Sequence, residues 1–127
     1  MSVDEGIRRS LSAAAQAALD RKAFQLAVLD VTELTSLADS FLICSGAHER
    51  QVGAIADAVE RKLKDVGRRP LHVEGRPACE WVLLDYGDLI IHVLTEQRRA
   101  FYGLDGLWGG ARMMEDELDI EDPGPAE

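Results

Sequence analysis

The stretch "EWVLLDYGDLIIHVL", residues 80–94, constrains the fold of this chain more than any other segment. Two apolar runs flank Tyr86-Gly87, and this pair fits a two-residue β-turn in which Gly87 supplies a positive φ. The turn predicts an antiparallel hairpin, and the length of the loop sets the register of its strands. The opposed residues in this register are Asp85 and Asp88, Leu84 and Leu89, Leu83 and Ile90, Val82 and Ile91, and Trp81 and His92.

Side chains alternate along a strand, so the hairpin is expected to have two different faces. A slip of one residue would exchange these faces, and the assignment therefore depends on the turn. The aliphatic face, expected to lie beneath a helix, consists of Val82, Leu84, Leu89, Ile91 and Val93. The other face consists of Trp81, Leu83, Asp85, Asp88, Ile90 and His92.

The rest of the chain alternates between helical and strand patterns. Helices are predicted over residues 2–22, 48–65 and 95–108, the last with two glycines that can break it. Strands are predicted over 24–31, 40–46 and the short 71–75. This order predicts a single α/β domain with a mixed β-sheet of about five strands and flanking helices. The predicted buried positions of the first two helices are Ile7, Leu11, Ala14, Ala18, Val52, Ile55, Ala56, Val59 and Leu63.

Negative charge is concentrated at the C-terminus. Residues 112–127 hold seven acids and one base, which is −6 of the net charge of −9. We therefore expect a folded domain over 1–111 and an acidic, disordered tail over 112–127. Because phosphate backbones repel an acidic chain, we expect little direct nucleic-acid contact and favour a basic protein partner.

The sequence also predicts the compartment of this protein. No apolar run is long enough to span a bilayer, and the N-terminus lacks the basic-then-apolar order of a signal peptide. Cys44 and Cys79 have no CxxC spacing and are expected to be reduced, buried thiols. These features predict a cytoplasmic protein without membrane contact.

The polar residues of the hairpin do not have the spacing of a metal site. Asp88 and His92 are separated by about 13 Å along a strand, at roughly 3.3 Å per residue, whereas zinc ligands lie about 2.0–2.2 Å from the ion. We therefore expect no metal and no cofactor, with His92 as a structural residue beside Trp81. The Asp85–Asp88 pair leaves two interpretations open, a solvated hairpin tip or an acidic clamp for a partner's Lys or Arg.

Several motifs together resemble the ribosomal silencing factors, also called the Iojap-like family. They cover about residues 22–111 and are "FQLAVLDVTELTSLADSFLICSG", "ERQVGAIADAVERKLKDVG", "VEG", "WVLLDYGDLIIHVL" and "RRAFYGLDGLWGGA". The resemblance implies a nucleotidyltransferase-like fold without the catalytic motif. It also implies a translational repressor that binds the large ribosomal subunit, chiefly through its fourteenth ribosomal protein. Such a factor blocks joining of the small subunit when nutrients are limiting.

The resemblance and the predicted hairpin together give a set of expected partner-binding residues. One departure from the family is His48, where the family usually has a serine that caps the following helix. We expect the cap to be weakened by about 1 kcal/mol or to pass to Ser45. The expected partner-binding residues are Glu74, Trp81, Leu83, Asp85, Asp88, Ile90, Arg99, Tyr102, Leu104 and Trp108.

Three alternatives accompany this interpretation. A metal-dependent nucleotidyltransferase needs a Gly-Ser turn followed by paired carboxylates, but this chain has Ser45-Gly46 followed by a helix. We therefore expect no enzyme activity. Edge strands and the apolar hairpin face could pair two copies, so a homodimer of the free protein is a second alternative. The spacing of Phe101, Leu104 and Trp108 fits helix packing as well as partner contact.

Overall fold

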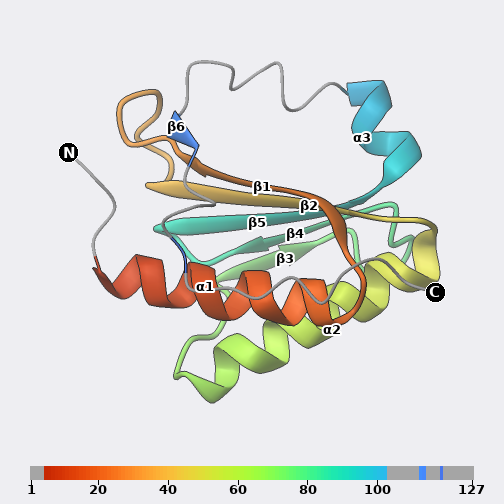
Figure 1. Ribbon diagram of the computed structural model, residues 1–127, viewed down its shortest axis with the longest axis horizontal. Coiled ribbons are helices and arrows are strands. Elements are labelled where there is room, and N and C mark those ends of the chain that lie inside the picture. The colour runs from red at the N-terminus through yellow and green to blue at the C-terminus, as the bar shows by residue number, and fades with distance from the viewer. Residues whose placement is uncertain (1–4, 103–111, 114–117, 119–127) are drawn as a thin grey trace.

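The computed structural model describes residues 5–102, 112–113 and 118, and they build one mixed β-sheet with helices packed on it (Figure 1). In the first half two helices flank two consecutive strands, whereas the second half is dominated by a hairpin. The elements are α1 (Glu5–Asp20), β1 (Phe24–Asp30), β2 (Ser40–Gly46), α2 (Glu49–Asp65), β3 (His72–Glu74), β4 (Trp81–Asp85), β5 (Leu89–Thr95), α3 (Glu96–Tyr102) and β6 (Arg112–Met113).

The strand order is β3-β4-β5-β2-β1-β6. β2 and β5 run parallel, and all other neighbouring pairs are antiparallel. The predicted α/β class with a mixed sheet is therefore confirmed. The parallel pair is possible because α2 and the β3–β4 hairpin separate β2 from β5 in sequence.

The sheet extends beyond residue 111, where the sequence predicted the domain to end. Arg112 and Met113 pair with Asp30 and Leu29 of β1, and Leu118 is buried. The other residues of the segment 112–127 lie outside the described part of the chain, so the expected disorder of the tail stays a prediction.

α1 and α2 cover one face of the sheet, as Figure 1 shows. Every predicted buried position of these two helices is buried in the structure, with Ile7 at 3% exposure the most exposed of them. These residues recur at intervals of three and four, so each helix presents one apolar stripe to the strands. None of the described helices is long and apolar enough to cross a membrane.

A second apolar cluster lies on the opposite face of the sheet. Its centre is formed by Leu29, Phe41, Ile43 and Leu94, all 5% exposed or less.

Both predicted thiols are free, but only Cys44 is buried. Burial raises the pKa of the Cys44 thiol to about 12, whereas Cys79 is partly exposed, contrary to expectation.

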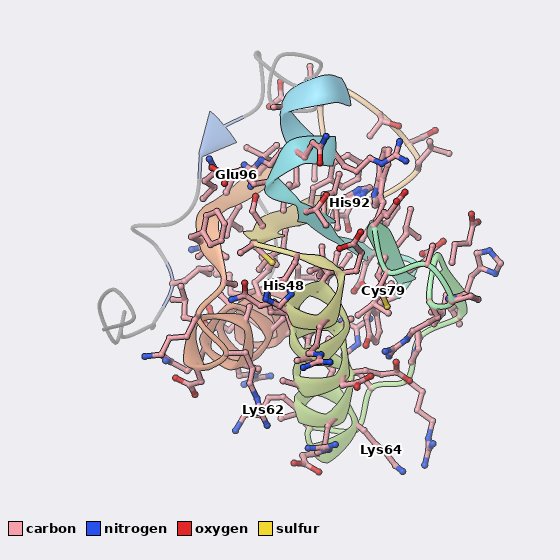
Figure 2. The ribbon with its side chains drawn as sticks, turned by 90° about the vertical axis from the view of Figure 1, so that its right-hand side faces the viewer. His48, Lys62, Lys64, Cys79, His92 and Glu96 are labelled. Atoms are coloured by element: carbon pink, nitrogen blue, oxygen red, sulfur yellow. The ribbon has the colours of Figure 1, made fainter. Side chains whose placement is uncertain are left out.

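The N-terminus of α2 is capped by His48 itself. The backbone N–H of Gln51 donates to His48 Nδ1 at 3.2 Å, and the Gln51 side chain accepts from the backbone N–H of Ala47 at 2.7 Å. Figure 2 shows α2 from this end, with His48 labelled. The expectation that the cap would pass to Ser45 is wrong, because the Ser45 hydroxyl donates to Gln25 Oε1 at 2.7 Å.

Candidate functional site

The β4–β5 hairpin forms its turn one residue later than the sequence predicted. Asp85 pairs with Ile90, and the Tyr86 N–H donates to the Leu89 carbonyl at 2.8 Å, so Gly87 and Asp88 form the turn. Gly87 has φ +90, and a glycine at the first central position is what a type II′ turn needs. Every predicted cross-strand pair is therefore wrong, because each residue of β4 pairs with the residue of β5 that lies two positions further along the chain than predicted.

A shift of two residues leaves each strand residue on its predicted face, because side chains alternate with a period of two. The aliphatic face is confirmed: Val82, Leu84, Leu89, Ile91 and Val93 all have 0% exposure beneath the helices. On the opposite face Leu83, Asp85 and Ile90 are partly exposed. The hairpin thus combines one buried face with one that solvent reaches.

Trp81 and His92 are in contact on this second face, although they are not directly opposed. Trp81 pairs with Leu94, and His92 with Leu83, so the two rings are diagonal neighbours. The Trp81 indole N–H donates to His92 Nδ1 at 3.2 Å, and their ring centroids lie 6.0 Å apart. His92 also makes an edge contact with Phe41, with centroids 5.3 Å apart.

His92 is a structural residue in this arrangement. It is 9% exposed, and burial lowers the pKa of its imidazole to about 4. Because Nδ1 accepts the indole hydrogen bond, the neutral ring carries its proton on Nε2. The neutral His92 imidazole therefore supports the partly exposed Trp81 ring without placing a charge in the protein interior.

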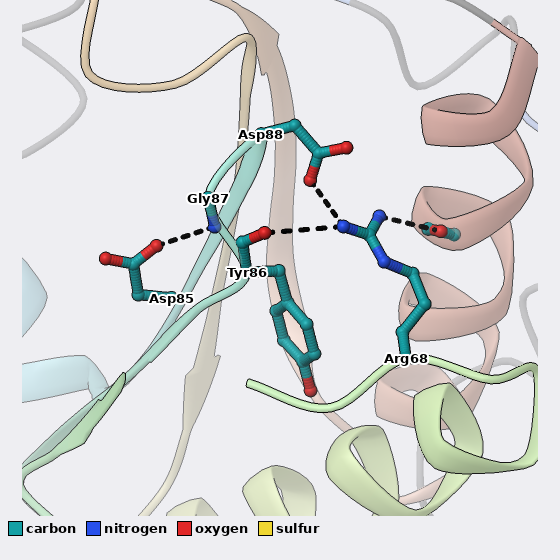
Figure 3. A network of polar contacts seen from close by, with 6 residues as sticks. Arg68, Asp85, Tyr86, Gly87 and Asp88 are labelled. Atoms are coloured by element: carbon teal, nitrogen blue, oxygen red, sulfur yellow. Dashed lines mark hydrogen bonds and ion pairs between the residues drawn. The ribbon is translucent and has the colours of Figure 1, made fainter. Parts of the chain in front are cut away.

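The two carboxylates of the hairpin do not face each other, as Figure 3 shows. Asp85 Oδ1 accepts from the backbone N–H of Gly87 at 2.8 Å, and Asp88 Oδ1 accepts from Arg68 at 2.7 Å. The predicted opposition of Asp85 and Asp88 is therefore wrong, because the later turn removes Asp88 from the strand ladder. Asp85 remains on the partly exposed face.

Strand β3 adds a second carboxylate to this face. Glu74 pairs with Leu83 in the β3–β4 ladder, and His72 pairs with Asp85, so these side chains share one face. Glu74 is exposed and lies 2.6 Å from His72 Nε2. We call the partly or fully exposed residues of this surface the hairpin face, and they are His72, Glu74, Trp81, Leu83, Asp85 and Ile90.

The predicted residues near the C-terminus do not all belong to this surface. Arg99 is 7% exposed and donates to the Gln25 carbonyl and to the Ser45 hydroxyl, so it attaches α3 to the ends of β1 and β2. Tyr102 is the last residue of α3, and its side chain lies outside the described part of the structure. Leu104 and Trp108 also lie outside the described residues.

A hollow of about 300 Å³ lies at the carboxyl ends of the parallel strands β2 and β5, where α/β enzymes often bind their ligands. Its lining includes Glu49 and Glu80, and Glu80 accepts from Arg98 at 2.5 Å. Within the described residues, no group of three or more His, Cys, Asp or Glu side chains is placed to hold a metal ion.

Sequence reasoning did not single out Arg68, which organises the turn of the hairpin. Its guanidinium donates to Asp88, to the Tyr86 carbonyl at 3.3 Å and to the Ser10 hydroxyl at 3.1 Å. It also lies 5.7 Å from the centre of the Tyr86 ring. These contacts join residues far apart in the sequence, so no local pattern could have revealed them.

A sequence profile of the family described as "Ribosomal silencing factor during starvation" matches residues 4–127. The ribosomal silencing factor RsfS of Halalkalibacterium halodurans is 39% identical over 105 residues, covering 83% of this chain and 90% of that protein. The chloroplastic protein Iojap of Zea mays is 32% identical over 111 residues, covering 84% of this chain and 46% of that protein.

A solved structure shares the fold. A crystal structure of a Chromobacterium violaceum protein superposes with a TM-score of 0.79 at 34% identity, covering 94% of this chain and 97% of that one. A second crystal structure, from Bacillus halodurans, gives a TM-score of 0.72 at 37% identity and covers 80% of this chain.

Proposed function

This chain belongs to the family of ribosomal silencing factors, and we propose that it represses translation by binding the large ribosomal subunit. In this proposal its chief contact is the fourteenth large-subunit ribosomal protein. The bound factor obstructs joining of the small subunit, in the cytoplasm and under nutrient limitation. The role is regulatory and involves no catalysis.

The observation that carries the proposal is the hairpin face. It combines a tryptophan and two aliphatic side chains with the carboxylates of Glu74 and Asp85. A partly exposed tryptophan with apolar neighbours is the kind of residue that dominates interface energy. Carboxylates beside it favour a partner that carries Lys or Arg. The face therefore suits a basic protein such as a ribosomal protein.

The size of the protein is sufficient for steric obstruction. A folded chain of 127 residues has a radius of gyration of roughly 14 Å. Side-chain rearrangement cannot accommodate a body of this size between two subunits. The factor then acts by mass action, because the bound large subunit is removed from the population that can join.

Two substitutions in the hairpin face test the proposed dock. Trp81→Ala should weaken binding to purified large subunits by about 2 kcal/mol or more, because it removes the apolar centre of the face. Glu74→Lys should weaken binding at least about tenfold, because it places a like charge against a basic partner. Co-sedimentation with large subunits over a range of protein concentrations gives both affinities.

Glu74→Lys also separates loss of binding from loss of folding. Trp81 contacts His92, so its truncation destabilises the protein to some extent. The Glu74 side chain is exposed, and His72 is its one polar partner among the described residues. Asp20→Lys, at the exposed end of α1, is the matched charge reversal outside the face. If Glu74→Lys and Asp20→Lys bind equally well, the hairpin face is not the dock.

The free protein is proposed to form a homodimer that covers part of this surface. Light scattering of the purified protein measures its mass in solution. A monomer at all concentrations would remove this part of the proposal without affecting the ribosomal one.

A further inference from the structure

The C-terminal end of α2 carries a positive charge that the proposed dock does not use. Residues 61–69, "RKLKDVGRR", contain five bases and one acid, a net charge of +4. The whole chain has −9, so the other residues together carry −13. We call Arg61, Lys62, Lys64, Arg68 and Arg69 the basic end of α2.

Four of these five cations, all except Arg68, are exposed. α2 buries only the stripe that ends at Leu63, so the side chains of Arg61, Lys62 and Lys64 point to solvent. Figure 2 shows Lys62 and Lys64 extending from α2 away from the sheet. Together with Arg69, these residues form no ion pair within the part of the chain that the structure describes.

The backbone after α2 returns toward the helix and brings Arg69 to the same end. Gly67 has φ +89, and the Arg68 N–H donates to the Leu63 carbonyl at 2.8 Å, which closes the helix in a reversing turn. The Arg68 side chain is held by Asp88, so the turn that carries Arg69 is anchored. The position of Arg69 is thereby set by the fold.

α1 contributes another cation to this region. Arg9 lines a hollow of about 430 Å³ together with Val66 and Arg68, so the N-terminal part of α1 lies beside the end of α2. Arg9 is exposed and forms no ion pair among the described residues. Cations from two helices and a turn therefore meet at one end of the molecule.

Stabilisation of the helix does not account for this arrangement. Lys62 and Lys64 lie in the last turn of α2, where positive charge favours the helix dipole. That effect falls off within the last turn, so it does not account for Arg69 beyond the helix or Arg9 on another helix. The excess positive charge is better suited to an external anion.

We propose that the basic end of α2, with Arg9, binds the phosphate backbone of ribosomal RNA on the large subunit. The inference rests on the proposed function, which places the protein on a particle that contains RNA. Lysine binds a phosphate as a point charge and arginine binds it through its planar guanidinium, and residues 61–69 contain no aromatic side chain to stack on a base. The contact is therefore independent of base sequence.

The basic end and the hairpin face lie on opposite sides of the sheet, and they approach each other at the turn of the hairpin. Arg68 donates to Asp88 at the turn of the hairpin, so the basic end adjoins the tip of the hairpin (Figure 3). A ribosomal surface that has protein next to RNA could contact the hairpin face with its protein and the basic end with its RNA. The net charge alone predicted little nucleic-acid contact because it averages this end with the acidic remainder of the chain.

The test compares two triple substitutions with the same change of charge. Lys62, Lys64 and Arg69 are replaced by Gln in the first protein, and Arg21, Lys22 and Arg50 in the second. All six side chains are exposed, and the second set lies outside the basic end. Binding of each protein to purified large subunits is measured by co-sedimentation between about 50 and 200 mM salt.

Each phosphate contact contributes about 0.7 to 0.9 to the slope of log Kd against log salt. We expect the first triple substitution to weaken binding and to reduce this slope by about 2, and the second to leave the slope near that of the wild type. Equal slopes for wild type and both variants would overturn the inference. Melting curves by circular dichroism confirm that the variants are folded.

A photoreactive residue in place of Lys64 identifies the class of the neighbour. A cross-linked product that ribonuclease degrades supports RNA, whereas cross-links to ribosomal protein alone would overturn the inference in favour of an acidic protein surface. If wild type does not bind large subunits at any salt concentration, the proposed function itself fails. Wild-type binding with an unchanged slope in the first variant rejects only the RNA contact.

Discussion

At the scale of single residues, the contact between Trp81 and His92 explains how a large aromatic side chain can be held near the surface. The indole N–H has an acceptor in the neutral imidazole, and the imidazole in turn packs on Phe41. A buried polar ring without a partner would destabilise the fold. The hydrogen bond between the Trp81 indole and His92 gives both rings a polar partner, and it orients the tryptophan at little energetic cost.

The pKa of His92 makes stability depend on pH. Burial lowers it from an ordinary 6.5 to about 4, so the unfolded chain binds this proton at higher pH than the folded one. The contribution is complete above about pH 6.5 and is lost as the pH falls toward 4. Between about pH 7.5 and pH 5 the wild type should lose about 2 kcal/mol of stability through this residue.

His92→Gln isolates this effect, because glutamine does not titrate and its carbonyl can still accept from Trp81. Urea unfolding of both proteins at the two pH values gives the free energies. The difference between wild type and variant should decrease by about 2 kcal/mol at the lower pH. An identical pH dependence in both proteins would show that His92 is not the titrating group.

At the scale of the elements, α2 connects the two ends of the molecule. Its N-terminus is attached to the turn after α1, because the Gln51 side-chain amide donates to the carbonyls of Arg21 and Lys22. Its C-terminus is attached to the hairpin through Arg68. One helix therefore sets the position of the basic end relative to the hairpin face.

The cap of α2 provides a prediction for this element. His48→Ala removes the acceptor for the Gln51 N–H and should destabilise the protein by about 1 kcal/mol. His48→Ser restores an acceptor of the type that helices prefer at this position, and it should be at least as stable as the wild type. Thermal melting of the three proteins tests this order, and equal stability of His48→Ala and wild type would contradict it.

At the scale of the whole molecule, the sheet separates a supporting face from an exposed one. α1 and α2 cover one side, where the hairpin residues are fully buried, and toward β1 and β2 the opposite side is also buried. Only toward β4 and β3 does that side remain accessible. Burial of the helix-covered face stabilises the fold. The accessible face of β3 and β4 is not needed for that purpose, so its residues are available for recognition of a partner.

Obstruction by a whole folded protein predicts a stoichiometric effect. When the protein is added to separated subunits, joined ribosomes measured by sucrose-gradient sedimentation should decrease until the factor equals the large subunits. A catalytic mechanism would instead act far below equivalence. Adding the factor after the subunits have joined should have a weaker effect, because the surface is then occupied by the small subunit.

The sequence by itself predicted the described helices and strands except β6, and it predicted the division of the hairpin into two faces. These follow from local periodicity, which does not change when a strand shifts by two residues. The same reasoning placed α2 and β2 correctly, because their apolar patterns are long and uninterrupted.

Only the tertiary structure decided which residues meet. The bond from Arg68 to Asp88 and the burial of Arg99 depend on contacts between distant segments. The turn at Gly87-Asp88, in contrast, agrees with the local preference for glycine at the first central position of a type II′ turn. The net charge could not reveal that the cations gather at one end, which only the arrangement of the helices makes visible.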